Sequence, residues 1–235
     1  LALILLVATN VVLLANELYL MWIALESTAL VAALLIIRPD SQASRQASFR
    51  YLLFSSVGLG LVLLGLSCLA RSEGANGEFF ISELQSRVGS GDRWEKLGVA
   101  LTLLGLGTKL GLAPMYSWLP EAYDEAPPAV TALLGAVQFN ATLLMIFRVV
   151  QIFRPTCGPL VSSELMVMGV VSMLVSTFNI VSVRNVKRLV AYASINHAGV
   201  IAIGLAIGEG ASYGVLLYVL SNAFIKAILF LTSGK

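Results

Sequence analysis

Four ionisable residues lie inside long apolar stretches of this chain: Glu26, Lys109, His197 and Lys226. An ionised group at the centre of a membrane helix costs roughly 2.5–3.5 kcal/mol even on the mildest insertion scale, so such residues mark ion and proton pathways. Loss of water disfavours the charged form of a lysine or a glutamate, whereas an opposite charge nearby favours it. A Glu/Lys pair can therefore be poised so that a small change in separation moves a proton. These residues predict a proton relay.

Each of the four residues also has a structural interpretation. Lys109 and Lys226 could be paired with a carboxylate or a carbonyl that fixes helix packing, or could extend their long stems to the membrane surface. Glu26 has no such stem, but it could belong to a fixed structural pair. His197 could be a neutral histidine that is hydrogen-bonded inside a bundle. The residues alone leave both interpretations open.

Polar and small residues recur at helical spacing around the ionisable ones. Tyr218, Asn222 and Lys226 are four residues apart and so share one helix face. Such a face cannot point to lipid without leaving donors unsatisfied, so it should turn inward, where it could hold water. The alternative is contact between helices, the commoner use of small and polar residues in membrane bundles. Similar stripes are Ser172, Ser176 and Asn179; Tyr192 and Asn196 beside His197; Thr102, Gly105 and Lys109; and Thr131, Gly135, Gln138 and Thr142.

One helix is predicted to break just after Lys109. Pro114 removes a backbone donor and disfavours helix at Ala113. A helix that is interrupted beside a buried lysine exposes carbonyl groups near it, as at the ion sites of transporters. A short helix over 115–124 at the membrane surface should follow. The alternative is an ordinary helix end with a proline-rich turn.

The elements that position these residues must be membrane helices. Hydrophobic residues make up 58% of the 235 and charged residues 12%, whereas soluble domains carry about 25% charged residues. Because a spanning helix needs roughly 20 mostly apolar residues, we expect an all-α, polytopic transmembrane helix bundle with a broken helix. Both ends fall in apolar runs, so 1–235 is expected to be one domain cut from a longer protein. The predicted spans are about 1–15, 17–37, 48–70, 96–113, 128–149, 162–182, 189–207 and 213–234.

The charges of the connecting segments predict the orientation. Basic loops stay in the cytoplasm, which places loops 38–50 and 183–188 there, in what we expect to be a bacterial inner membrane. Loop 114–127 must lie on the same side although it is acidic. The long 71–95 loop lies on the other side, with glycine turns and, over 78–84, a short hairpin or a helical turn. The basic residues of the cytoplasmic side are Arg38, Arg45, Arg50, Arg184, Lys187, Arg188 and Lys235.

Several functional classes are disfavoured by the sequence. The stretch from Gly105 to Lys109 is only superficially like a phosphate-binding loop, because it lies in an apolar helix. Cys68, in an apolar run, and Cys157, in a predicted loop, are too far apart to suggest a metal or redox site. A single histidine cannot provide two haem ligands. A net charge of +2 without a basic aromatic patch does not suggest nucleic acid. We therefore expect no metal and no cofactor in this chain.

Four motifs carry a family resemblance. Together they resemble the antiporter-like subunits of respiratory complex I, membrane-bound hydrogenases and multisubunit Na⁺/H⁺ antiporters. The stretches Glu26-Ser-Thr-Ala-Leu30 and Leu112-Ala-Pro-Met115 are most similar to hydrogenase-4 F subunits. The four motifs are Gly107-Thr-Lys-Leu-Gly-Leu-Ala-Pro-Met-Tyr-Ser-Trp-Leu-Pro-Glu-Ala-Tyr-Asp-Glu-Ala-Pro127, Trp22-Ile-Ala-Leu-Glu26, Lys187-Arg-Leu-Val-Ala-Tyr-Ala-Ser-Ile-Asn-His-Ala-Gly199 and Asn222-Ala-Phe-Ile-Lys-Ala-Ile-Leu-Phe230.

The resemblance implies roles for these residues. Segment 1–149 would match the first five-helix repeat of an inverted-repeat fold, and 162–235 would begin the second. Glu26 and Lys109 would be the coupled pair that gates a half-channel. Lys226 would continue the lysine relay with His197 near it, and the break at Pro114 would make Lys109 accessible. The supporting polar path would comprise Gln138, Asn140, Asn179, Asn222 and Tyr218.

Two departures from the family pattern leave alternatives open. Asn140 stands where a lysine or histidine is frequent, and Asn222 where histidine is frequent. Asparagine can bridge a path through water but cannot itself take a proton. The leading hypothesis is a proton-translocating subunit of a redox-driven complex, an NADH-quinone oxidoreductase or a hydrogenase, whose electrons travel in another subunit. The alternatives are an Na⁺/H⁺ antiporter subunit without a redox partner and a structural subunit that does not conduct. The expected partners are the lipid bilayer, other membrane subunits, and protons or Na⁺.

Overall fold

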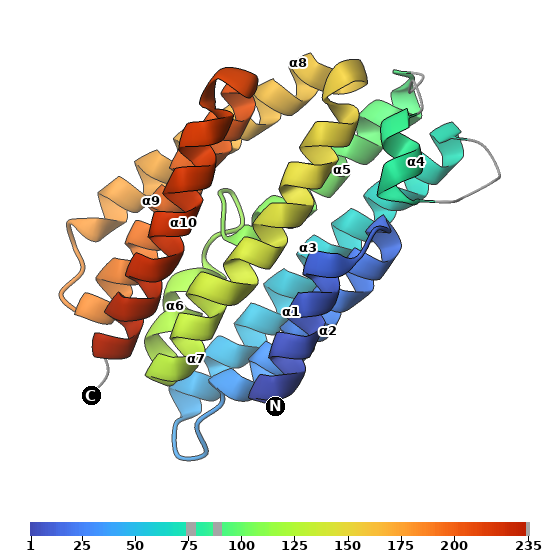
Figure 1. The fold of residues 1–235 in the computed structure, drawn as a ribbon. Coiled ribbons are helices and arrows are strands. Elements are labelled where there is room, and N and C mark those ends of the chain that lie inside the picture. The colour runs from blue at the N-terminus through green and yellow to red at the C-terminus, as the bar shows by residue number, and fades with distance from the viewer. Residues whose placement is uncertain (74–78, 87–90, 234–235) are drawn as a thin grey trace.

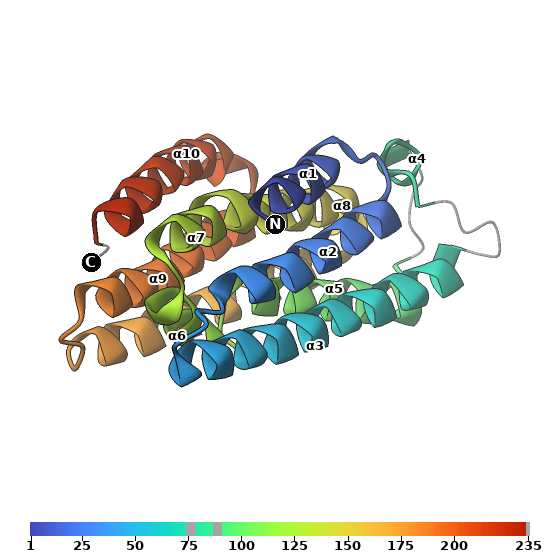
Figure 2. The same cartoon turned by 90° about the horizontal axis from the view of Figure 1, so that it is seen from below.

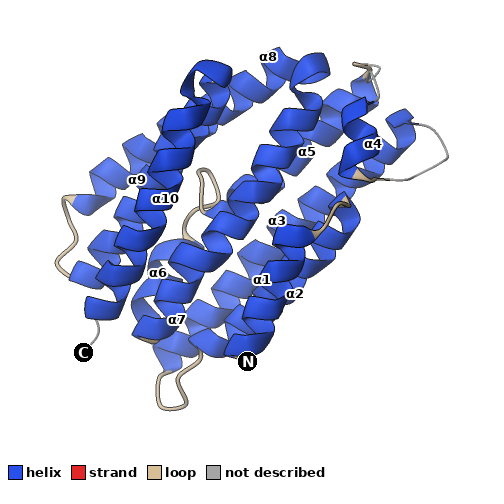
Figure 3. Ribbon diagram, in the orientation of Figure 1, coloured by secondary structure: helices blue, strands red, loops and turns tan. Residues whose placement is uncertain are grey.

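The computed structural model, which describes residues 1–73, 79–86 and 91–233, is a bundle of long helices (Figures 1 and 3). Over these residues β-structure is limited to one isolated bridge, between Glu17 and Phe80, so the predicted all-helical fold is confirmed. The helices are α1 (Ala2–Leu14), α2 (Leu18–Ile36), α3 (Gln42–Glu73), α4 (Ile81–Ser86), α5 (Arg93–Leu110), α6 (Trp118–Glu125), α7 (Pro128–Ala132), the π-helix η1 (Leu133–Gln138), α8 (Phe139–Ile180), α9 (Val186–Ile207) and α10 (Glu209–Thr232).

Long apolar helices make this chain an integral membrane protein. In the described part of the chain, five helical segments are long and apolar enough to cross a bilayer: Leu18–Ile36, Gln42–Ser72, Pro128–Ile180, Val186–Ile207 and Glu209–Thr232. Large apolar side chains cover their outer surfaces; Phe178, for example, is 77% exposed and Leu220 57%. Apolar surface of this extent is stable only against lipid or another protein. Each of the eight predicted spans lies in a helical segment.

Two predicted spans, 128–149 and 162–182, belong to one continuous segment. The chain turns back inside α8, where Cys157 has non-helical φ −117° and ψ 23° between Pro155 and Pro159 (Figure 1). One non-helical residue flanked by prolines is enough to kink a helix sharply. The prediction of a loop around Cys157 was therefore wrong, because this residue is buried inside the kink.

Two polar stretches that had been predicted as loops are partly helical. Helix α3 begins at Gln42, so the loop predicted over 38–50 is short, and Arg45 and Arg50 lie on the helix. The Ser41 hydroxyl accepts the Ser44 N–H (3.1 Å), a helix-starting contact that an apolar count does not detect. In the 71–95 stretch, α4 agrees with the helical alternative, and Gly91 (φ +60°) makes a turn. Gly74, Gly77, Glu78, Gly89 and Lys235 lie outside the described residues.

Helix α3 packs against both α2 and α5 (Figure 2). Gly58 of α3 meets Gly105 of α5 so closely that a Cβ on Gly105 would strike the Gly58 carbonyl oxygen. The Thr102 hydroxyl donates to the Gly98 carbonyl of its own helix (2.7 Å). For Thr102 and Gly105 the helix-contact interpretation is therefore correct. This close approach brings Lys109, on the same stripe, against α3.

The predicted acidic and basic segments meet at one end of the bundle. Arg38 pairs with Glu125 (2.6 Å), and Arg50 of α3 pairs with Glu121 of α6 (2.5 Å). Lys187 of α9 donates to the Asp124 carbonyl oxygen (3.0 Å). The acidic 114–127 segment thus lies at the same end of the bundle as the basic segments. Two of its carboxylates pair with arginines there.

Candidate proton-relay site

Lys109 is buried at the end of α5, and the hydrogen bonds of its amine within the described residues go to two hydroxyl groups of α3. Its side chain is 4% exposed, and its Nζ donates to Ser55 Oγ (2.7 Å) and Tyr51 OH (3.3 Å). Tyr51 and Ser55 are four residues apart and so present both oxygens on one face. Among the residues that the structure describes, no carboxylate forms a salt bridge with Lys109. The alternative of a stem that reaches the surface was therefore wrong, and within the described residues the hydrogen-bond partners are hydroxyls in place of the carboxylate or carbonyl of the other alternative.

The helix that carries Lys109 ends at a glycine and not at Pro114. Gly111 adopts the left-handed conformation (φ +88°), which favours glycine and closes α5 three residues before Pro114. The Leu112 N–H donates to the Gly107 carbonyl (2.8 Å), and Trp118 Nε1 donates to the Thr108 carbonyl (3.0 Å). The helix is broken as predicted, but these two last-turn carbonyls are occupied. The glycine signal was overlooked beside the stronger proline signal.

The segment after the break is held by a distant helix. The Ala113 N–H donates to Ser172 Oγ on the second leg of α8 (2.8 Å). Ser172 belongs to a predicted polar stripe, and here it serves as an acceptor for an otherwise unpaired backbone group. The surface helix begins at Trp118, three residues later than predicted, because Gly111 to Ser117 connect the two helices. These contacts fix the path of the chain beside Lys109.

Gln138 extends the Lys109 contacts to a third helix. Its Nε2 donates to Tyr51 OH (2.8 Å) and to Thr28 Oγ1 of α2 (3.0 Å). Both amide hydrogens are thus used, which fixes the side-chain orientation. The sequence had marked Gln138 but neither Tyr51 nor Ser55. Their i, i+4 spacing was the available signal, and it was missed because the 48–70 span contains no buried charge.

Glu26 of α2 also contacts a hydroxyl of α3. One carboxylate oxygen, Oε1, accepts from Ser56 Oγ (3.1 Å), and the other, Oε2, is buried without a hydrogen-bond partner among the residues described. Glu26 and Lys109 form no direct salt bridge within the described ranges. They instead contact Ser56 and Ser55, two adjacent residues of α3. The two groups that the sequence had paired are therefore linked in the structure through neighbouring hydroxyls of α3.

Lys226 is buried without a hydrogen-bond acceptor. Its side chain is 2% exposed, and its Nζ lies 3.8 Å from the centroid of the Phe139 ring. Within the described residues its Nζ makes no hydrogen bond, and neither does Nδ2 of Asn222, one turn away and 4% exposed. The interpretation that Lys226 extends to the membrane surface was wrong. Its amine is held at the face of an aromatic ring.

His197 joins α9 to α10 through one hydrogen bond. Its Nδ1 pairs with Tyr218 OH, and the ring centroids are 5.6 Å apart. Tyr218 shares the α10 face of Asn222 and Lys226, so His197 is brought to the stripe that the sequence had predicted. This hydrogen bond is equally compatible with the structural interpretation of a satisfied histidine.

Asn140 and Asn179 are not brought into these contacts. Each donates from its Nδ2 to its own helix, Asn140 to the Ala136 carbonyl (2.7 Å) and Asn179 to the Val175 carbonyl (2.8 Å). The Oδ1 of Asn140 is buried without a hydrogen-bond partner. Back-bonding to the preceding turn is a local preference of such side chains. Within the described residues, no hydrogen bond therefore links Asn140 or Asn179 to the other residues of the predicted path.

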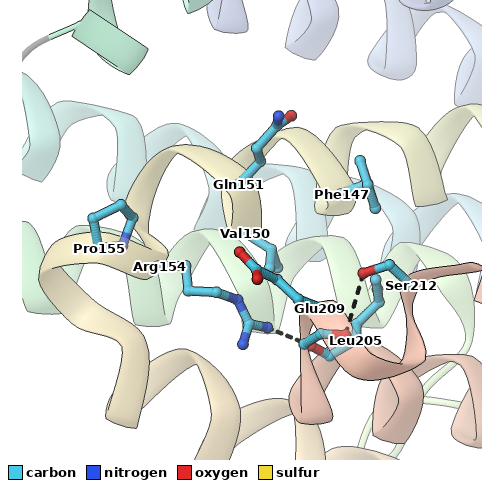
Figure 4. Close-up of a pocket in the computed structure, with 9 residues that line it drawn as sticks. Phe147, Val150, Gln151, Arg154, Pro155, Leu205, Glu209 and Ser212 are labelled. Carbon is cyan, nitrogen blue, oxygen red and sulfur yellow. Dashed lines mark hydrogen bonds between the residues drawn. The ribbon is translucent and has the colours of Figure 1, made fainter.

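A cavity of about 450 Å³ lies away from these residues, between α8 and the α9–α10 junction (Figure 4). Phe147, Val150 and Leu205 form apolar walls, and Arg154 and Glu209 add charges. None of the predicted relay residues lines it. Over the described residues, no group of three or more histidine, cysteine, aspartate or glutamate side chains could hold a metal ion.

Comparison with known proteins identifies the family. Residues 15–235 match the family described as NADH:quinone oxidoreductase/Mrp antiporter, transmembrane. The chain belongs to this family. A hydrogenase-4 component F homolog of Methylacidiphilum infernorum is 29% identical over 98% of this chain and 50% of that relative. The NADH-quinone oxidoreductase subunit N of Magnetococcus marinus is 33% identical over 80% of this chain and 39% of that relative.

The fold of this family member is also found in a solved structure. The archaeal membrane-bound sulfane sulfur reductase complex contains a chain that superposes with a TM-score of 0.89 at 24% identity, over 97% of this chain and 47% of that one. The predicted family and the predicted polytopic fold are both confirmed. This family member spans about half the length, or less, of the relatives that it matches.

Proposed function

We propose that this family member is a proton-translocating membrane subunit of a redox-driven complex, of the NADH-quinone oxidoreductase or hydrogenase type. The observation that carries the proposal is the buried Lys109 amine, which bonds to Ser55 and Tyr51 and through Tyr51 is linked to Gln138. The names of the relatives, a hydrogenase component and a quinone oxidoreductase subunit, support a redox complex. The electrons would travel in other subunits.

The hydroxyl groups of α3 would connect Glu26 with Lys109. Serine and tyrosine hydroxyls both donate and accept hydrogen bonds, so each can release one proton as it receives another. Glu26 Oε2, which has no hydrogen-bond partner, is available to take a proton. Because Coulomb energy falls with distance, a shift of α3 that moves Ser55 and Ser56 would change how strongly a charged Glu26 stabilises a charged Lys109. His197, Lys226, Asn222 and Tyr218 would continue the path.

We also infer the setting of this segment. Segments 38–50 and 183–188 would face the cytoplasm of a bacterial inner membrane, because their arginines and lysines follow the positive-inside rule. The acidic segment 114–127 would lie there with them, because Glu125 pairs with Arg38 and Glu121 with Arg50. Residues 1–149 would form the first inverted repeat and 162–235 the start of the second. Other membrane subunits would be the partners, as the relatives' names indicate.

Sodium–proton antiport is the second candidate function. The family description includes Mrp antiporters, and Glu26 Oε2 beside Ser56 offers the oxygen ligands that a hard cation prefers. A non-conducting structural subunit is the third candidate. It is favoured by the side chains of Asn140 and Asn179, whose hydrogen bonds within the described residues go to their own helices.

The test is proton uptake by the full-length complex in vesicles, measured during turnover and separately under an imposed sodium gradient. Lys109→Ala and Glu26→Gln should each reduce uptake strongly under turnover. Lys96→Ala is the matched control, since Lys96 lies on the same helix but is exposed. If these two variants lose proton uptake under the sodium gradient but keep it during turnover, the result would favour antiport. Unchanged uptake in both Lys109→Ala and Glu26→Gln would overturn the relay and favour the structural subunit.

A further inference from the structure

Two adjacent residues at the junction of η1 and α8 contact the two buried lysine sites. Gln138 donates to Tyr51, which also accepts from Lys109. The next residue, Phe139, places its ring 3.8 Å from Lys226 Nζ. A π-helical turn such as η1 is rare and frequently marks a functional site. At this junction, Gln138 is therefore linked to Lys109 by hydrogen bonds through Tyr51, whereas Phe139 contacts Lys226 through its phenyl ring.

The Lys226 side of the junction lacks the polar partners that its donors require. Lys226 Nζ and Asn222 Nδ2 lie one turn apart on α10, and in the described structure neither is hydrogen-bonded. An ammonium group without acceptors is expensive in an apolar environment, and the attraction of a ring face offsets only part of that cost. Buried donors of this kind are normally satisfied by ordered water. The Phe139 ring covers the amine where such a water would bind.

The Phe139 ring that lies against Lys226 is itself enclosed by the fold. Phe139 is 4% exposed, and Phe230 of α10, fully buried, lies against Gly135 of η1. Helix α10 therefore presses its buried face, with Asn222, Lys226 and Phe230, onto the junction. A hydrophobic constriction that excludes water is a recognised way to close an ion pathway.

We propose that Phe139 gates the relay: its ring separates the Lys109 contacts from Lys226, and proton passage between the two lysines requires the ring to move so that water enters. This inference rests on the proposed function and adds the residue that controls it. With water admitted, the Lys226 ammonium gives a proton to water and becomes the neutral amine, and the water gives a proton to the next hydroxyl. Each step breaks one N–H or O–H bond and forms another.

The experiment measures passive proton leak across an imposed pH gradient, without turnover, in vesicles that hold the full-length complex. Phe139→Ala should raise the leak several-fold and lower coupled uptake. Phe139→Leu, which keeps an apolar plug, should raise it less. Adding Lys226→Met to Phe139→Ala should return the leak to the wild-type level, because the path then lacks its lysine. Phe147→Ala, on the same helix at the separate cavity of Figure 4, is the matched control and should not leak.

The outcomes separate a gate from simple packing. If Phe139 only supports α10, Phe139→Ala should lower the melting temperature without any leak, which would overturn the gate. A leak that persists in the double variant would also overturn it. If Phe139→Ala does not assemble, Phe139→Val opens a smaller gap, and the absence of a leak there would be decisive against the proposal. Failure of the proposed function has a different signature, since Lys109→Ala would then retain wild-type coupled uptake.

Discussion

The two buried lysines differ in what surrounds their amines. Lys109 and Lys226 are 4% and 2% exposed, so burial does not distinguish them. Lys109 has two hydroxyl acceptors and, through Tyr51, a link to Gln138. Lys226 has the face of one phenyl ring. A charge is therefore accommodated at Lys109 by the folded chain itself, whereas at Lys226 it requires a change in the surroundings.

This difference arises from how closely the helices approach. Helices α3 and α5 meet at glycines, so the hydroxyls of Tyr51 and Ser55 come within reach of a lysine stem. Helix α10 meets the η1–α8 junction at two aromatic rings, because Phe139 of α8 lies against Lys226 and Phe230 of α10 lies against Gly135 of η1. Small residues let membrane helices approach closely enough for polar contacts. Bulky aromatic side chains hold the helices further apart. The first site is suited to hold a proton and the second to control its passage.

The largest effect should follow from separating α3 and α5. Gly105→Ala places a methyl group against the Gly58 carbonyl, and overpacking of this kind costs about 1–3 kcal/mol. The Lys109 contacts to Ser55 should lengthen, so proton uptake should fall together with the melting temperature of the complex. Gly60→Ala is the control, because a Cβ there meets nothing within 4 Å. Equal behaviour of the two variants would show that helix approach does not determine the Lys109 site.

Replacing each lysine with methionine should affect stability differently. Lys109→Met removes the lysine donor from Ser55, while Tyr51 keeps the donor of Gln138, and an unsatisfied buried group costs about 1–3 kcal/mol. Lys226→Met breaks no hydrogen bond and removes a buried donor that has none, so it should be neutral or stabilising. Thermal unfolding of the two purified variants, with Lys96→Met as the exposed control, measures the contrast. Equal destabilisation would mean that Lys226 has acceptors in the assembled complex.

The sequence predicted the helices and the buried charges but not the contacts between them. Apolar runs locate spans because one helix in lipid needs little more than length and hydropathy. Asn222 and Lys226 could be placed on one inward face by spacing alone. The spacing of Tyr51 and Ser55 also puts them on one face, but it does not reveal the partner of that face, which the meeting of Gly58 with Gly105 decides. The turn at Cys157 depends likewise on one residue between prolines, which a hydropathy window does not resolve.

The smallest effect is expected from an exposed ion pair at one end of the bundle. Arg50 pairs with Glu121 (2.5 Å), and their side chains remain 56% and 33% exposed. Exposed ion pairs contribute only about 0.2–1 kcal/mol and are screened by salt. Arg50→Gln should therefore lower the melting temperature slightly at low ionic strength and not at high, with Arg45→Gln, on the same turns of α3, as the matched control. Proton uptake should stay near wild type, because Lys109 would keep both hydroxyl acceptors. A large loss of uptake in Arg50→Gln would mean that α6 transmits surface charge to Lys109, and direct contact would then no longer suffice to explain the difference between the two lysines.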